Sequence, residues 1–144
     1  MGEFRSIACI SDVHISEILA ERMTAVLGPA WPSLRLSGDA WAYVDGRRAL
    51  GVGGIEPVWP GRYVLWSYEA GLGMGDWKRV LRFTRLRIDR AFEDPAVRRI
   101  EATGAIDSPR FCRFLQRLGF ELEGRMTAYA PTGATMDMFA RVRP

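Results

Sequence analysis

A glycine-rich stretch supplies the first residues whose spacing could support chemistry. Gly71, Gly73 and Gly75 stand in AGLGMGD, between an apolar segment and a long amphipathic one. Glycines at this spacing let consecutive backbone N–H groups converge on an anion, and the start of a helix favours negative charge. The stretch therefore predicts a phosphate-binding turn, although such glycines are also typical of a strand-to-helix turn that binds nothing.

Charged side chains follow the glycines directly. Asp76 brings negative charge to the place where phosphates would approach, and it is also suited to capping the helix. Lys78 and Arg79 are candidates for binding a phosphate, because cations attract it. Four further arginines lie on the same segment: Arg82, Arg85, Arg87 and Arg90. This basic run suits a phosphate group, DNA or an acidic protein surface, but a solvated helix face explains it more simply.

Two carboxylates are candidates for a general base. Glu69 ends the segment RYVLWSYE, whose apolar residues point to both faces and therefore predict a central strand. A carboxylate in this place can accept the proton of an attacking amine. Glu101 on the neighbouring predicted strand is the second candidate. The simpler interpretation is that both are solvated residues at the ends of strands.

Other nucleophilic and metal sites are excluded by composition. His14 is the only histidine, so the segment CISDVHIS cannot begin a two-metal phosphoesterase site, which needs several more. A histidine-based zinc site and a Ser-His or Cys-His pair are excluded for the same reason. His14 is expected to be an exposed residue of the first helix. Cys9 and Cys112 form no CxxC motif.

Length and composition indicate one ordinary globular domain. The chain has 144 residues, 48% of them hydrophobic, and a formal charge of +3. We expect a single domain over residues 1–144. No apolar run approaches the ~20 residues that a membrane-spanning helix needs. The expected location is therefore the cytoplasm, with no membrane partner.

Periodicity predicts interleaved helices and strands. The predicted strands are 3–10, 40–44, 48–55, 62–69, 97–106, 120–129 and 134–143, and the predicted helices are 11–27, 77–94 and 108–118. The first helix is expected to begin at a cap formed by Ser11 or Asp12. The order β-α-β-β-β-α-β-α-β-β predicts the α/β class, with a single mixed sheet and helices on both faces.

The segment SPRFCRFLQRLG has the form of a short capped helix. Ser108 is placed to cap it, and Pro109 at the first helical position has no N–H to lose. Leu115 belongs to its apolar stripe, and Gly119 stands where a left-handed residue ends a helix. A short amphipathic helix packed on a sheet explains these features.

The end of this helix, followed by ELEG and a hairpin, resembles the closing segment of the GNAT family of N-acetyltransferases. RYVLWSYE and GLGMG fall where that family has its acetyl-CoA diphosphate loop. The resemblance implies acyl-CoA N-acyltransferase chemistry, with acetyl-CoA or CoA as cofactor and no metal. The residues that it assigns to the cofactor are Gly71, Gly73, Gly75, Asp76, Lys78, Arg79 and Ser108.

Two positions depart from the family's pattern. The diphosphate loop normally starts with Gln or Arg, and Ala70 stands in that place. The usual tyrosine that protonates the thiolate is replaced by Leu115, which cannot donate a proton. Tyr68 and Tyr129 are possible substitutes, but nothing in the sequence places their hydroxyls. The resemblance thus implies a retained scaffold with eroded catalytic positions.

SPRFCRFLQRLG also resembles the pattern NxxxxRFLxxxG of short phage proteins of the same fold that are linked to virion assembly, with Ser108 in place of Asn. This resemblance implies a phage-encoded virion or assembly component, in the host cytoplasm and in the virion. Its partners would be other virion proteins or further copies of itself. Two alternatives stay open: an active acetyl-CoA-dependent N-acetyltransferase, and a basic nucleic-acid-binding protein.

Overall fold

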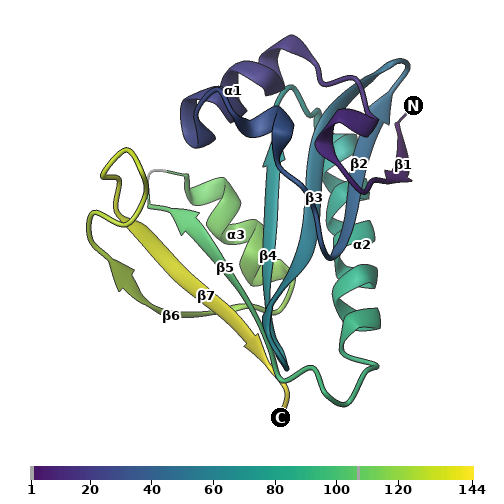
Figure 1. Ribbon diagram of the computed structural model, residues 1–144. Coiled ribbons are helices and arrows are strands. Elements are labelled where there is room, and N and C mark those ends of the chain that lie inside the picture. Colours follow the sequence, from purple (N-terminus) through teal and green to yellow (C-terminus); the bar gives the residue numbers. More distant parts are fainter. Residues whose placement is uncertain (1, 107) are drawn as a thin grey trace. The chain divides into compact units, whose positions relative to one another are not determined.

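The computed structural model describes residues 2–106 and 108–144 and contains, within them, seven strands and three α-helices (Figure 1). The strands are β1 (Glu3–Ser6), β2 (Asp39–Asp45), β3 (Arg48–Trp59), β4 (Arg62–Glu69), β5 (Arg99–Ala105), β6 (Glu121–Met126) and β7 (Met136–Val142). The α-helices are α1 (Glu17–Leu27), α2 (Met74–Ala91) and α3 (Pro109–Arg117). Two short 3-10 helices, η1 (Ile10–Asp12) and η2 (Trp31–Ser33), flank α1.

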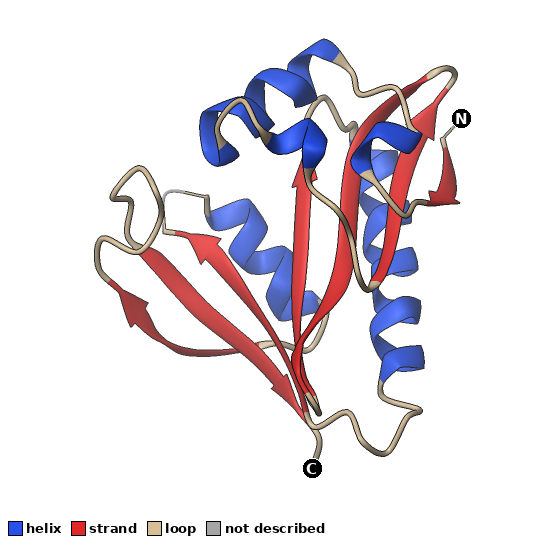
Figure 2. Ribbon diagram, in the orientation of Figure 1, coloured by secondary structure: helices blue, strands red, loops and turns tan. Residues whose placement is uncertain are grey.

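The strands form one mixed sheet in the order β1-β2-β3-β4-β5-β7-β6 (Figure 2). β4 is the fourth of these seven strands, as its apolar residues on both faces predict, and its bounds are those expected. The order of elements is also the predicted one, with the two 3-10 helices added. The α/β class and the single mixed sheet are therefore confirmed.

The chain forms two compact units. The first comprises residues 1–56 and 66–80, and the second comprises residues 57–65 and 81–144. The single domain expected over residues 1–144 stays a prediction.

Helices contact both faces of β2 in the first unit. Ala42 and Val44, on one face, belong to a buried cluster with Leu19 and Met23 of α1. Tyr43 points to the opposite face, where its hydroxyl contacts the first turn of α2. All five residues from Ala40 to Val44 are buried, as a strand covered on both sides requires.

The second unit contains the C-terminal hairpin. β7 lies between β5 and β6 and is antiparallel to both. α3 packs near β5, where a Cβ on Gly104 would lie 3.1 Å from the sulfur of Cys112. β4 pairs with β5 in parallel, and their register comprises only three pairs, from Arg62 with Arg99 to Val64 with Glu101.

The predicted start of the first helix is wrong. α1 begins at Glu17, and its cap is Ser16, whose Oγ accepts a hydrogen bond from the Leu19 N–H at 3.3 Å. Asp12 instead accepts the N–H groups of two preceding residues and closes the 3-10 turn η1. His14 is exposed as expected, but it precedes α1 in an extended segment, where its carbonyl accepts the Ala49 N–H at 2.7 Å.

Candidate active site

The glycine turn leads into α2 as predicted. Gly73 directly precedes the helix, and its carbonyl accepts the first intrahelical bond, from the Trp77 N–H at 3.1 Å. Gly71 has a φ of +74°, a conformation that favours glycine. A Cβ on Gly75 would meet nothing within 4 Å, so this glycine is not required by packing. Only one of the three glycines is therefore needed for the turn itself.

Asp76 occupies the amino end of α2 with both carboxylate oxygens engaged. Its Oδ2 accepts the Gly73 N–H at 2.9 Å, which is the capping role expected from the sequence. Its Oδ1 accepts the Tyr43 hydroxyl at 2.6 Å. The two bonds hold the carboxylate between the turn and β2.

These bonds keep Asp76 ionised and Tyr43 neutral. The hydrogen bond from Tyr43, followed by that from the Gly73 N–H, lowers the pKa of Asp76. Burial, assisted by the neighbouring carboxylate, raises the pKa of Tyr43 to about 12. At neutral pH the end of the helix therefore holds a full negative charge supplied by the chain itself.

A diphosphate group fits the backbone of this turn but not its side chains. The first N–H groups of α2 have no intrahelical acceptor and would suit a phosphate. The ionised Asp76 accepts the N–H of Gly73, the residue just before these groups, and a second anion beside it would be repelled. Lys78 and Arg79 are exposed in the same unit, and the charge of Arg79 lowers the pKa of Asp76. The residues present do not fit the diphosphate of CoA while Asp76 keeps this position.

Glu69 is a buried carboxyl group at the end of β4. Its exposed fraction is 8%, and its Oε1 accepts a hydrogen bond from the Ser67 hydroxyl. A Cβ on Gly51 of β3 would lie 3.4 Å from its Cγ. Burial raises the pKa of Glu69 to about 7, although the Ser67 bond and the charge of Arg22 act in the opposite direction. Glu69 is thus not the solvated strand end of the simpler interpretation.

The alternation of β4 explains how a carboxyl group becomes buried. Trp66 and Tyr68 pack against the apolar cluster beneath α1. Ser67 and Glu69 therefore point to the opposite face, the face of Tyr43. The position of Gly51 supports this, since a Cβ there would lie 3.4 Å from Glu69 Cγ and 3.8 Å from Tyr43 Cβ.

Glu101, the second candidate base, is part of an ion-pair network in the second unit. Burial opposes its ionisation, but bonds from Arg62 and Arg99 outweigh this and lower its pKa. Arg99 also binds Glu123 with both terminal nitrogens, at 2.8 and 2.5 Å. A carboxylate held by two guanidinium groups is a poor proton acceptor, so Glu101 has a structural role.

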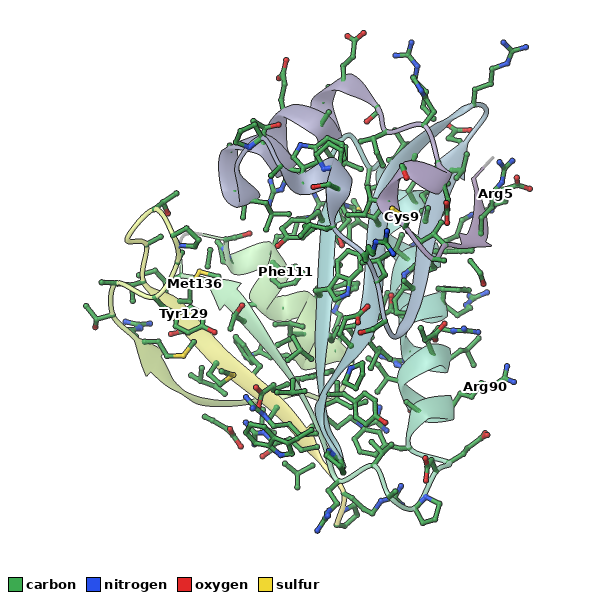
Figure 3. The ribbon with its side chains drawn as sticks, in the orientation of Figure 1. Arg5, Cys9, Arg90, Phe111, Tyr129 and Met136 are labelled. Carbon is green, nitrogen blue, oxygen red and sulfur yellow. The ribbon has the colours of Figure 1, made fainter. Side chains whose placement is uncertain are left out.

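The remaining predicted residues lie in the second unit. Ser108 is the N-cap residue of α3, as predicted, but its side chain makes no capping hydrogen bond; its carbonyl accepts the Cys112 N–H at 3.2 Å. Leu115 is fully buried in the core. Tyr129 is 55% exposed, in the connection between β6 and β7 (Figure 3). Leu115 thus belongs to the apolar face of α3, as its spacing predicts.

Sequence reasoning missed Tyr43 and Ser67. Tyr43 lies within the apolar run AWAYV, where a hydroxyl in a buried strand signals a polar partner. Ser67 lies two residues before Glu69 and therefore on the same face of the strand. No sequence signal links Tyr43 to Asp76, which lies 33 residues further along the chain.

Residues 2–106 and 108–144 offer neither a metal site nor a membrane-spanning helix. No group of three or more potential ligands is placed to hold a metal ion there. No helix in the same part of the chain is long and apolar enough to cross a membrane.

Comparison with solved structures identifies the fold. The ribosomal-protein-S5-alanine acetyltransferase from Vibrio fischeri matches with a TM-score of 0.67 and 14% identity, over 99% of this chain and 96% of that one. The IAA acetyltransferase from Bacillus cereus ATCC 14579 matches with a TM-score of 0.68 and 14% identity, over 99% and 100%. The aminoglycoside acetyltransferase AAC(6')-Ib, in complex with coenzyme A and kanamycin, matches at 0.62 and 16% identity, over 99% and 95%.

Comparison of the amino-acid sequence with known families and proteins finds no match. No protein-family model matches the chain, and no curated protein matches it. At such low identity the structural matches establish the fold alone. The chain has the fold of the GNAT acetyltransferases.

Proposed function

We propose that this protein is a GNAT-fold protein that does not transfer acetyl groups from acetyl-CoA, and that it acts through protein contacts in the structure or assembly of a phage virion. The observation that carries the first part is the position of Asp76, whose ionised carboxylate binds the Gly73 N–H and the Tyr43 hydroxyl. In this proposal the Asp76 carboxylate repels the diphosphate that the glycine turn would otherwise bind.

Two further side chains support the loss of catalysis. Leu115 replaces the tyrosine of the family's pattern and is fully buried, so neither its chemistry nor its location suits proton donation. Glu101 is bound by two arginines. The virion role rests on the resemblance of residues 108–119 to phage proteins of this fold.

Titration calorimetry with CoA tests the first part directly. We expect no binding by the native protein at millimolar CoA, because the diphosphate would be repelled. Asp76→Asn removes the charge and keeps a side-chain oxygen that can still accept the Gly73 N–H, and we expect it to gain measurable affinity. Micromolar binding by the native protein would contradict the proposal.

Density-gradient purification of phage particles tests the second part. A virion component remains with the particles at a fixed copy number, and cross-linking identifies its protein neighbours. Absence from particles, together with absence from assembly intermediates, would contradict this role whatever the calorimetry shows.

Glu69 favours a second candidate function, an active acetyl-CoA-dependent N-acetyltransferase. A general base works best when its pKa lies near the working pH, and that of Glu69 is raised to about 7 by burial. In this candidate Glu69 accepts the proton of the acceptor amine. It predicts thiol release from acetyl-CoA with some member of an amine panel, lost in Glu69→Gln. No release with any amine would favour the first proposal.

A further inference from the structure

The second unit carries an excess of positive charge that the first does not share. Residues 57–65 and 81–144 contain thirteen arginines, no lysine and eight acidic residues, a formal charge of +5. Residues 1–56 and 66–80 contain seven basic and nine acidic residues, a formal charge of −2. The net basic character of the chain therefore resides in one unit.

Most of this excess lies on two helices. The arginines of α2 within the unit are Arg82, Arg85, Arg87 and Arg90, and those of α3 are Arg110, Arg113 and Arg117. α3 contains no acidic residue. The α2 segment 81–91 contains one, Asp89, whose Oδ1 binds Arg141 at 2.8 Å. Protein surfaces normally intersperse both signs, as the exposed residues Glu21 and Arg22 of α1 do.

The two helices are in direct contact. The Arg85 guanidinium donates a hydrogen bond to the Arg117 carbonyl at the end of α3. Arg141 binds Asp89 of α2 and also donates to the Leu118 carbonyl at 3.4 Å. The first bond places Arg85 of α2 beside the end of α3 that carries Arg117, at a cost in mutual repulsion that an anionic partner would relieve.

Six of these seven arginines are exposed, and Arg87 is half-buried over the Phe83 ring. Thr84 and Ile88 of α2 and Phe114 of α3 are buried. Arg82 and Arg85 are exposed, as are Arg113 and Arg117. Figure 3 shows Arg90 extending away from α2 in the same way. The packing of both helices thus uses their apolar sides and leaves the charged sides accessible.

We propose that the face formed by Arg82, Arg85, Arg113 and Arg117, the arginine face, binds the phosphodiester backbone of a nucleic acid. Guanidinium groups bind phosphate oxygens through two parallel hydrogen bonds. Arg113 and Arg117 are one helical turn apart, about 6 Å, and phosphates rise about 3.4 Å per nucleotide along a strand. Neighbouring arginines can therefore bind phosphates within one or two nucleotides of each other.

The face is suited to backbone contacts and not to reading bases. No exposed aromatic residue lies within α3, whose Phe114 is buried and whose Phe111 is half-buried against it. Stacking of unpaired bases needs exposed aromatic rings. The binding is therefore expected to be independent of sequence and strongly dependent on salt. This inference does not rest on the proposed function, because its argument uses neither Asp76 nor the resemblance of residues 108–119 to phage proteins.

Fluorescence anisotropy with a labelled DNA duplex of random sequence tests the inference on the full chain. Four phosphate contacts predict a slope of about −3.6 in log K against log salt concentration. The double variant Arg113→Gln/Arg117→Gln should reduce this slope by about 1.8 and weaken binding about 50-fold at 0.1 M salt. Arg47→Gln/Arg48→Gln is the matched control, since it removes the same charge from two exposed residues in the first unit, one in the β2–β3 turn and one at the start of β3.

The outcomes separate the nucleic acid from other anions. The inference is supported if the helix variant loses binding, the control keeps it, and poly-glutamate of equal charge competes poorly. It is overturned if no binding occurs at 50 mM salt, if both variants lose binding equally, or if poly-glutamate competes as well as DNA. The last result would assign the face to an acidic protein. Circular dichroism melting curves confirm that both variants are folded.

Discussion

Tyr43 Oη lies 2.6 Å from Asp76 Oδ1, so a strand residue in the first third of the chain fixes the carboxylate at the start of α2. Asp76 is thereby held by two donors, a hydroxyl and the Gly73 N–H. A capping aspartate needs only the backbone donor. The tyrosine adds a contact between β2 and α2 and stabilises the ionised form of Asp76.

Loss of the Tyr43 hydroxyl should weaken the contact between β2 and α2. In Tyr43→Phe the free energy of unfolding should fall by about 1–2 kcal/mol, because a hydrogen bond to a charged group is lost while water still reaches Asp76. The pKa of Asp76 should rise toward its ordinary value, since the Tyr43 bond is the largest cause of its depression. Urea unfolding measures the first change, and NMR titration of the carboxyl carbon measures the second.

Tyr129→Phe provides the control for the hydroxyl deletion. Tyr129 is 55% exposed, so its variant should leave both quantities unchanged. Equal effects of the two substitutions would show that the Tyr43–Asp76 bond contributes nothing to stability.

Two alanine substitutions in the glycine turn should have opposite signs. Gly71→Ala places a side chain at a φ of +74° and should destabilise the protein by about 1–2 kcal/mol. Gly75→Ala adds a Cβ in open space within α2 and should stabilise it by about 0.4–1 kcal/mol, because the unfolded chain loses entropy. Thermal melting of the two variants beside the native protein checks both signs. Destabilisation by Gly75→Ala would mean that this glycine is required by a constraint beyond packing.

Leu115 should behave as a core residue. Leu115→Ala removes a fully buried side chain and should cost about 2–5 kcal/mol. Leu122→Ala, on the edge strand β6, removes the same atoms from a side chain that is 56% exposed and should change stability by about 0.5 kcal/mol or less. Urea unfolding of the two variants compares the costs directly. A small cost at Leu115 would show that its surroundings collapse easily.

The elements of the fold are largely predictable because their signals are local. β4 occupies the predicted residues 62–69, and α2 differs from the predicted helix by three residues at each end. The start of α1 was not predictable, because Ser11, Asp12 and Ser16 are all good caps. The choice of Ser16 follows from a pairing in which the Ser16 N–H donates to the Ala49 carbonyl on β3. A non-local hydrogen bond thus decided between equivalent local signals.

Only the turn and the helix capping of the candidate site could be predicted from the sequence. The glycines and the capping role of Asp76 follow from neighbouring residues. The Tyr43 contact depends on how β2 and α2 meet. The burial of Glu69 depends on β3, where Gly51 leaves room for its side chain. Such contacts join distant segments, and sequence patterns carry no information on their distances.

The raised pKa of Glu69 predicts that this residue destabilises the protein at high pH. Burial disfavours the ionised form and raises the pKa from 4.5 to about 7. The folded state therefore holds its proton over a pH range in which the unfolded state releases it. Stability should fall as the pH rises from about 4.5 to about 7, by up to about 3 kcal/mol in total.

Glu69→Gln cannot ionise and should escape this loss. The variant and the native protein should be about equally stable near pH 4, and the variant should be more stable at pH 8 by up to about 3 kcal/mol. Urea unfolding from pH 4 to pH 8 measures the difference, with Glu21→Gln on the exposed side of α1 as the control. If the free energy of unfolding of the native protein and of Glu69→Gln changed in parallel with pH, the carboxyl group of Glu69 would ionise freely in the folded state. Burial would then not raise its pKa toward neutrality, and Glu69 would not be suited to act as a general base there.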